Sequence, residues 1–155
     1  VLSNPKEADR KELNTNEKLL TWSDILALKK AGWEIGSHSS THVNFENLND
    51  RSLIKEVKEA KKILEKKLDS NISYFAYPKG SFSQRNTNFV KQCGFKYGFS
   101  VLPGNLNSQK DKYTMPRTII DSTHHSYDFP YLYSDSWFMI RKLTAPLKIW
   151  EKISQ

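Results

Sequence analysis

Apolar residues recur at helical spacing first between residues 21 and 32. Thr21 or Ser23 can act as the N-cap, because a hydroxyl oxygen accepts hydrogen bonds from the free N–H groups of a first helical turn. Gly32 follows a short basic run and is typical of the residue just beyond a helix C-terminus. The predicted buried side of this helix consists of Ile25, Leu26 and Leu28.

A second, longer amphipathic segment extends from Asn49 or Asp50, one of which caps it, to about Leu68. Its apolar residues recur every three or four positions, as expected for the buried face of an α-helix. They are Leu53, Ile54, Val57, Ala60, Ile63, Leu64 and Leu68. The polar stretch 69–71 ends the predicted helix.

Short apolar runs lie between and after these helices and predict strands at 33–37, 72–77, 96–101 and 118–121. A helix capped by Ser83 and closed by Gly94 separates the second of these runs from the third. The amphipathic segment 137–153 predicts a further helix with a break at Pro146. Strands that alternate with helices indicate βαβ crossovers, so we predict an α/β fold with a parallel sheet.

The composition is that of one globular domain, residues 1–155. A chain of 155 residues with 37% hydrophobic residues is long enough to bury a core. No apolar run approaches the roughly 18 residues of a membrane-spanning helix. Cys93 is the single cysteine, so no disulfide can form within the chain. Its place at a predicted helix end indicates a small buried residue rather than a nucleophile.

A net charge of +7 makes nucleic acid or an anionic cell surface conceivable partners. However, many of the lysines lie between residues 55 and 67, interleaved with Glu56, Glu59 and Glu65. That pattern is typical of a solvated helix face, and no aromatic–basic motif for RNA accompanies it. We therefore expect no nucleic-acid partner, and peripheral contact with an anionic cell surface stays open.

The strongest chemical signal is a pair of histidines, His38 and His42, in the small polar run 36–42. The run follows a predicted strand, and ligand sites of open α/β sheets gather at the carboxyl ends of strands. If a helical turn begins near His38, both rings lie on one face and can reach one metal ion. The alternative is two loop histidines with local hydrogen bonds only. Ser39 or Thr41 could fix a ring from within the loop.

Two further segments carry weaker signals. The turn Tyr77-Pro78-Lys79 ends a predicted strand and is either a plain β-turn or, facing a metal, a source of N–H groups for an oxyanion. His124 and His125 lie in a polar stretch after the last predicted strand. Either ring could serve as a general acid, because histidine ordinarily titrates near neutral pH, or both could be exposed loop residues.

Taken in order, these segments resemble the polysaccharide deacetylase family, which includes chitin, peptidoglycan and poly-N-acetylglucosamine deacetylases. The matching segments are 20–22 (Leu-Thr-Trp), 31–42 (Ala-Gly-Trp-Glu-Ile-Gly-Ser-His-Ser-Ser-Thr-His), 75–80 (Phe-Ala-Tyr-Pro-Lys-Gly) and 115–117 (Met-Pro-Arg). The block 31–42 is long and specific. The resemblance extends from residue 20 to about residue 120.

The resemblance implies a distorted (β/α) barrel and a divalent metal, most often zinc, held by two histidines and one aspartate. The histidines correspond to His38 and His42. The implied activity is that of a polysaccharide N-deacetylase, a hydrolase that removes N-acetyl groups from an N-acetylglucosamine polymer of a cell surface or exopolysaccharide. Backbone N–H groups near Tyr77, Pro78 and Lys79 would hold the oxyanion. The general acid would be one of the two histidines at 124 and 125.

The chain departs from the family pattern in its acidic motif. In the family, an Asp-Asp pair on the first strand supplies the third metal ligand and the general base, whereas the 155 residues here contain no such pair. Between the motif and the Leu-Thr-Trp segment the family has a helix and a strand, and residues 1–3 match the end of that strand. We therefore expect a barrel incomplete at its N-terminus, without its first strand and helix, and inactive by itself. Many family members carry an arginine where this chain has Ala76. The Ala-Tyr-Pro sequence, together with a later Pro-Arg, is typical of the poly-N-acetylglucosamine branch.

The alternative function is an inactive glycan-binding or interaction module with the same fold. A barrel without one strand and one helix leaves sheet edges unpaired, so marginal stability or self-association through those edges is expected. Family members mostly act outside the cytoplasm, so the resemblance implies an extracytoplasmic location: secreted, periplasmic or at the cell surface.

Overall fold

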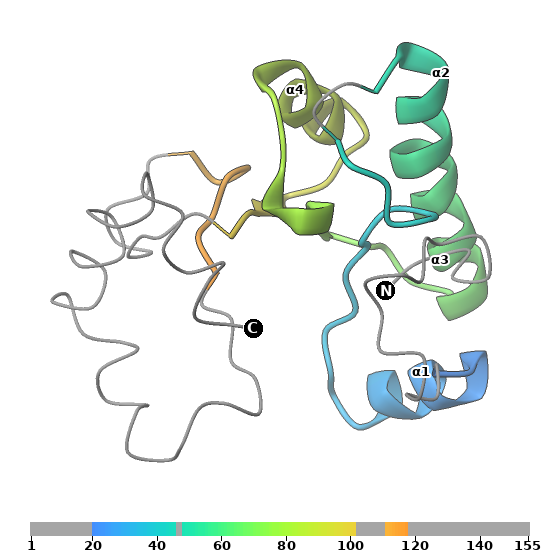
Figure 1. Ribbon diagram of the computed structural model, residues 1–155. Coiled ribbons are helices and arrows are strands. Elements are labelled where there is room, and N and C mark those ends of the chain that lie inside the picture. Colours follow the sequence, from blue (N-terminus) through green and yellow to red (C-terminus); the bar gives the residue numbers. More distant parts are fainter. Residues whose placement is uncertain (1–19, 46–47, 102–110, 118–155) are drawn as a thin grey trace, which may run out of the picture.

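The computed structural model describes residues 20–45, 48–101 and 111–117. In order, its elements are α1 (Trp22–Lys30), α2 (Asp50–Leu53), η1 (Ile54–Glu59), α3 (Ala60–Leu68), β1 (Tyr74–Ala76), η2 (Pro78–Gly80), α4 (Gln84–Gln92) and β2 (Tyr97–Phe99). Helices and strands alternate as predicted. In Figure 1, α2 continues through α3 as one long rod beside α4, and α1 lies apart near the end of α3. The predicted strand 118–121 and helix 137–153 lie outside the described residues.

The helix α1 begins with a capping box, which confirms its predicted start. The Thr21 hydroxyl accepts a hydrogen bond from the Asp24 N–H at 3.2 Å, and the Asp24 carboxylate accepts one from the Thr21 N–H at 2.8 Å. Gly32 follows the helix with a φ of 91°, a conformation that favours glycine. The predicted buried face is too wide, because Ile25 is buried whereas Leu26 is 44% exposed.

The long helix runs without a break from its cap at Asn49 to Leu68, and η1 is a π-helical stretch within it. The residues that recur along one stripe, Leu53, Val57, Ala60, Leu64 and Leu68, are buried as predicted. Ile54 and Ile63 are 42% and 40% exposed, because each lies to the side of that stripe. Among the residues that the structure describes, no helix is both long enough and apolar enough to cross a membrane.

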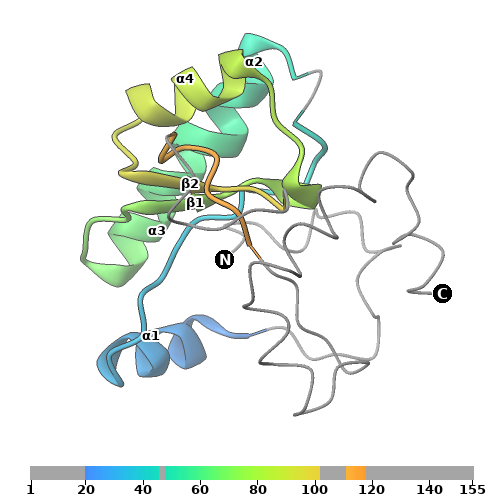
Figure 2. The ribbon, with the colours of Figure 1, turned by 90° about the vertical axis from the view of Figure 1, so that its left-hand side faces the viewer.

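The sheet is parallel, as the alternation of helices and strands predicted. β1 pairs with β2, with Tyr74 opposite Tyr97 and Ala76 opposite Phe99. Isolated parallel bridges join Ser37 to Phe75 on one side and Met115 to Phe99 on the other. The predicted strand 33–37 is therefore reduced to a single paired residue, Ser37. Figure 2 shows β1 beside β2, with α2 and α4 on one side of the pair and α1 below it.

The core lies on the side of the sheet that α2 and α4 cover, and it centres on Phe75. This side chain is fully buried, and its ring lies 5.5 Å from that of Phe45, 5.2 Å from Tyr77 and 5.2 Å from Phe95 between centroids. Because side chains alternate along a strand, Tyr74 and Ala76 point to the opposite face. The strand β1 therefore separates an apolar core from the face on which the candidate site lies.

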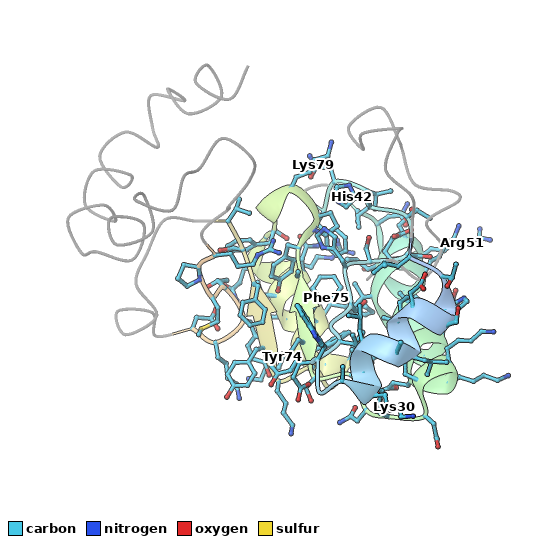
Figure 3. All side chains as sticks on the ribbon, turned by 90° about the horizontal axis from the view of Figure 1, so that it is seen from below. Lys30, His42, Arg51, Tyr74, Phe75 and Lys79 are labelled. Carbon is cyan, nitrogen blue, oxygen red and sulfur yellow. The ribbon has the colours of Figure 1, made fainter. Side chains whose placement is uncertain are left out.

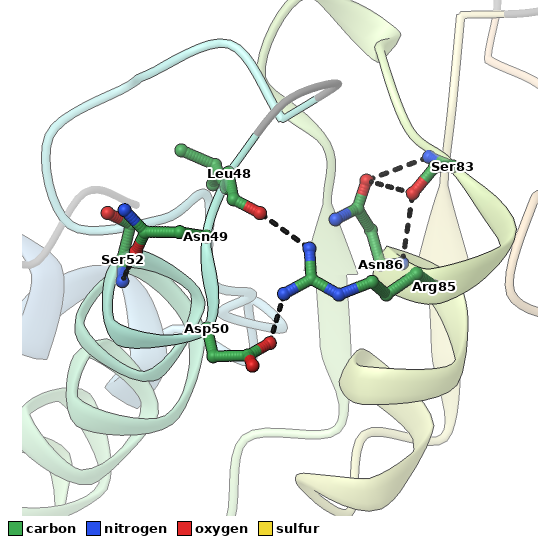
Figure 4. Close-up of polar contacts among 7 residues, drawn as sticks. All are labelled: Leu48, Asn49, Asp50, Ser52, Ser83, Arg85 and Asn86. Carbon is green, nitrogen blue, oxygen red and sulfur yellow. Dashed lines mark hydrogen bonds and ion pairs between the residues drawn. The ribbon is translucent and has the colours of Figure 1, made fainter.

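Charged side chains hold α4 in place. Arg85 forms an ion pair with Asp50 and donates a hydrogen bond to the Leu48 carbonyl, which joins the start of α4 to the start of the long helix (Figure 4). At the other end, Lys61 is only 9% exposed and donates to the carbonyls of Cys93 and Gly94, each at 3.2 Å. The prediction of a solvated charged face is therefore wrong at Lys61, because its ammonium group caps a neighbouring helix.

Cys93 should react slowly with alkylating reagents. Partial burial at the end of α4 raises the pKa of its thiol, and the nearby charges of Lys58 and Lys61 oppose that effect only in part. Because the thiolate is the nucleophile, iodoacetamide should label the folded protein several times more slowly than the urea-unfolded chain at the same pH. Mass spectrometry of timed samples measures both rates, and equal rates would contradict a protected thiol.

Candidate metal centre

The loop after residue 37 is fixed to the carboxyl end of β1 by backbone hydrogen bonds. The Ser37 N–H donates to the Tyr74 carbonyl at 2.8 Å, and the Ala76 N–H donates to the Ser37 carbonyl at 2.9 Å. This pairing puts His38 beside Ala76 on the face of the sheet away from the core. The location at strand carboxyl ends is the one that the sequence predicted. In Figure 3, His42 and Lys79 project from neighbouring loops at this end, and Tyr74 lies at the other.

The ring of His38 is held by one strong hydrogen bond. Its Nδ1 lies 2.7 Å from the Ala76 carbonyl oxygen, which can only accept, so Nδ1 carries the proton and Nε2 keeps its lone pair. Burial lowers the pKa of His38 to about 4, and the charges of His42 and Arg117 add to this, against the opposing effect of the Ala76 hydrogen bond. The imidazole is therefore neutral near pH 7, which is the form that binds metal ions.

His42 lies next to His38, but not through a helical turn. The ring centroids are 4.9 Å apart in an edge-on arrangement. Ser39 and His42 have positive φ values of 69° and 61°, so the segment is an irregular loop and the predicted turn of helix is wrong. The Ser39 hydroxyl accepts a hydrogen bond from the His42 N–H at 2.9 Å, which fixes the backbone rather than either ring.

Glu56 is a polar residue of this site that the sequence interpretation placed on a solvated face. It is only 4% exposed, and its carboxylate accepts hydrogen bonds from the backbone of Ser40 and Thr41. The signal was present in the spacing, since residue 56 lies three positions after Leu53 and four before Ala60 on the buried stripe. A glutamate on such a stripe needs a partner inside the protein.

A cavity of about 530 Å³ opens beside His38. Its walls come from the loop before His38, from the outward face of the sheet and from the segment after Met115. The lining residues are Gly36, Ser37, His38, Tyr74, Ala76, Phe99, Pro116 and Arg117. This volume lies within the roughly 300–1,000 Å³ typical of small-molecule sites.

Arg117 is the cation that lines this cavity, and the sequence singled it out only as part of a motif. Its Nε donates to the Ser100 carbonyl at 2.9 Å, and Nη2 lies 3.4 Å from the Tyr77 carbonyl. Burial lowers its pKa, yet a guanidinium stays charged at any physiological pH. The bridge between Met115 and Phe99 brings the motif to β2, so the arginine takes a fixed position beside His38.

Pro78 and Lys79 lie in η2, a tight turn that Tyr77 precedes as N-cap and in which Lys79 has a φ of 55°. The Tyr77 N–H donates to the Phe99 carbonyl at 2.9 Å, and Pro78 has no N–H. The Tyr77 ring is fully buried in the core, where burial raises the pKa of its phenol. The turn adjoins the cavity through Ala76, and its role with an oxyanion stays a prediction.

The described part of the chain does not complete the predicted metal site. Within residues 20–45, 48–101 and 111–117, no cluster of three or more histidine, cysteine, aspartate or glutamate side chains forms a metal site. His124 and His125 lie outside these ranges, so their predicted role as a general acid stays a prediction. What the structure brings together is an imidazole pair, an arginine and a cavity.

A family model described as polysaccharide deacetylase matches residues 5–98. Among curated proteins, the poly-beta-1,6-N-acetyl-D-glucosamine N-deacetylase of Staphylococcus aureus (strain MRSA252) is 25% identical over 114 residues, 68% of this chain and 39% of that protein. The relative from strain MSSA476 matches to the same extent. The chain thus spans 39% of the length of these curated relatives.

Solved structures show the same fold. The deacetylase PplD of Streptococcus pyogenes, solved in complex with acetate, superimposes with a TM-score of 0.70 at 19% identity, over 83% of this chain and 56% of that chain. IcaB from Ammonifex degensii superimposes with a TM-score of 0.63 at 17% identity, over 86% of this chain and 58% of that chain. Since the family model matches more than half of the residues, the chain belongs to the polysaccharide deacetylase family.

Proposed function

We propose that this chain provides the histidine side of a metal-dependent N-deacetylase site acting on an N-acetylglucosamine polymer. The observation that carries the proposal is the pairing of the His38 and His42 rings, together with a cavity that His38 and Arg117 line. Family membership and the Staphylococcus aureus relatives, named as deacetylases of poly-beta-1,6-N-acetyl-D-glucosamine, support the substrate class. The proposal includes a distorted (β/α) barrel and an extracytoplasmic place of action on a cell-surface or exopolysaccharide substrate.

The imidazole pair fits a divalent metal, and its nitrogen donors favour zinc. His38 is neutral, its Nδ1–H is used by Ala76, and its Nε2 is therefore the donor atom. His42 supplies a second ring 4.9 Å away between centroids. A metal held by His38 and His42 would supply polarisation of a water molecule and of the acetamide carbonyl. The aspartates of the family's Asp-Asp motif would supply the third ligand and the general base. The 155 residues of this chain do not contain that motif.

The chain's own residues would bind and orient the acetamide group. Arg117 puts a fixed positive charge on the cavity wall, where it can hold a carboxylate or stabilise charge that develops on an oxygen. Ala76 contributes a small side chain and a carbonyl that orients the His38 ring. We place the oxyanion contact at the backbone near Lys79, in the turn that adjoins the cavity through Ala76. Proton transfer to the leaving amine is assigned to His124 or His125.

The test measures bound zinc and acetate release from N-acetylglucosamine oligomers. Both are determined for the chain and for a form extended at its N-terminus by a strand with the Asp-Asp motif. We expect the extended form to release acetate, a chelator to stop the release and added zinc to restore it. Comparison of β-1,6- and β-1,4-linked oligomers tests the substrate class. An extended form that binds zinc and glycan without releasing acetate would instead establish an inactive glycan-binding module.

A further inference from the structure

The loop that joins the two histidines has an unusual backbone conformation. Ser39 and His42 both have positive φ values, which non-glycine residues rarely adopt without support from their surroundings. A hydrogen bond from the His42 N–H to the Ser39 hydroxyl joins two residues of the loop at 2.9 Å. A group outside the loop contacts the two residues between them and can set the separation of the two rings.

Glu56 is such a group. Its Oε2 accepts hydrogen bonds from the N–H groups of Ser40 and Thr41, at 3.0 and 2.9 Å. Its Oε1 accepts a third from the Thr41 hydroxyl at 2.9 Å. Both carboxylate oxygens thus hold two successive residues midway between His38 and His42. Hydrogen bonds to an ionised acceptor are about twice as strong as neutral ones, and burial shields these from water.

The helix that carries Glu56 is itself held in place. Glu56 lies in η1, the π-helical stretch of the long helix, and π-turns are frequent at functional sites. Its neighbours Leu53, Val57 and Ala60 are buried in the core. The carboxylate consequently links the position of a rigid helix to the loop between the two histidines.

We propose that Glu56 is a positioning residue for the His38–His42 pair, setting the ring separation at which both imidazoles can bind one divalent cation. The cation part of this inference rests on the proposed function. The positioning part does not, because it concerns the distance between two rings in the metal-free protein. A purely structural Glu56 would affect stability and leave ring geometry and cation affinity unchanged in the folded protein.

The experiment compares Glu56→Ala and Glu56→Gln with Glu59→Gln, a matched control at an exposed position of the same helical stretch. In the metal-free protein, we expect Glu56→Ala to abolish the nuclear Overhauser effect between the two imidazole rings. Amide exchange at Ser40 and Thr41 should rise at least about tenfold. Zinc affinity measured by calorimetry should fall about 10- to 100-fold, the range typical of losing a group that orients a metal ligand. The control should change none of these.

Glu56→Gln should recover part of the affinity, because its amide keeps one acceptor oxygen while placing a donor against backbone N–H groups. If Glu56→Ala does not fold, Thr41→Val replaces it, since that change removes only the hydroxyl hydrogen bond and leaves the helix intact; a smaller loss of zinc affinity is expected.

Two outcomes separate this proposal from the proposed function. A folded Glu56→Ala protein that keeps both the nuclear Overhauser effect between the rings and the zinc affinity of the wild type overturns the assignment of Glu56. If neither this chain nor the form extended by the Asp-Asp strand binds zinc, but Glu56→Ala still abolishes the nuclear Overhauser effect between the rings, the proposed function is refuted and Glu56 is upheld as the residue that positions them.

Discussion

Replacement of His38 by alanine should abolish zinc binding and acetate release in the form of the protein that is extended by the Asp-Asp strand. The change removes one of the two imidazoles that meet at the carboxyl end of β1. Loss of a group that merely orients a ligand costs about 10- to 100-fold in affinity, so loss of a ligand should cost more. No other histidine of the described residues lies at the cavity to replace it. Calorimetric titration with zinc and an acetate assay measure the two effects.

The same change should have little influence on folding. His38 is half-buried and makes one hydrogen bond, to the Ala76 carbonyl, so its removal should lower the free energy of unfolding by only about 1 kcal/mol. Lys96→Ala is the control, because that exposed side chain lies just before β2, at the opposite end of the sheet. It should leave zinc affinity unchanged. If folded His38→Ala protein keeps the zinc affinity of the wild type, His38 is not a ligand.

Helix starts were predictable from the sequence because their causes are local. The caps at Thr21, Asn49 and Ser83 each accept a hydrogen bond from a backbone N–H three residues later, and the pattern of residue types is enough to find them. The strand 33–37 was overpredicted for the opposite reason. Whether an apolar run becomes a strand depends on a partner distant in sequence, and only Ser37 meets one, at Phe75.

The proximity of the two histidines was predictable from the sequence, whereas the geometry of the loop between them was predictable only in part. A histidine pair after an apolar run suggested metal ligation, and the structure does place the His38 and His42 rings together. The helical turn on which a shared face depended does not form, since Ser39 and His42 have positive φ values and the Ser40 N–H donates to Glu56 of a later helix. Glu56 was assigned to the solvated face because it lies among charged residues in the sequence. Its spacing from the apolar residues of the buried stripe indicates the opposite. Arg117 was identifiable only as a motif, since its position depends on pairing between Met115 and Phe99.

Gly98→Ala should destabilise the protein and displace the segment that carries Arg117. Gly98 lies in the centre of β2, and a Cβ atom there would lie 2.4 Å from the Tyr113 carbonyl oxygen and 3.0 Å from its carbonyl carbon. These are backbone atoms, so they cannot move aside as the end of a side chain could. The Gly98 N–H also donates to the Lys112 carbonyl at 2.9 Å, and its carbonyl accepts from the Met115 N–H at 2.8 Å. A methyl group therefore forces apart two segments that are hydrogen-bonded to each other.

Inserting a methyl group into such a contact costs about 1–3 kcal/mol, which urea unfolding should detect as a lower midpoint at unchanged slope. Gly32→Ala is the informative counterpart: nothing lies within 4 Å of a Cβ at that position, but the φ of 91° is unfavourable for alanine. Gly32→Ala therefore measures the cost of backbone strain alone, whereas Gly98→Ala measures the cost of a steric clash with the Tyr113 backbone. Only Gly98→Ala should speed amide exchange at Met115. It alone should also weaken the binding of a ligand by Arg117 at the cavity. Equal exchange at Met115 in both variants would show that Gly98 does not control the approach of the arginine segment.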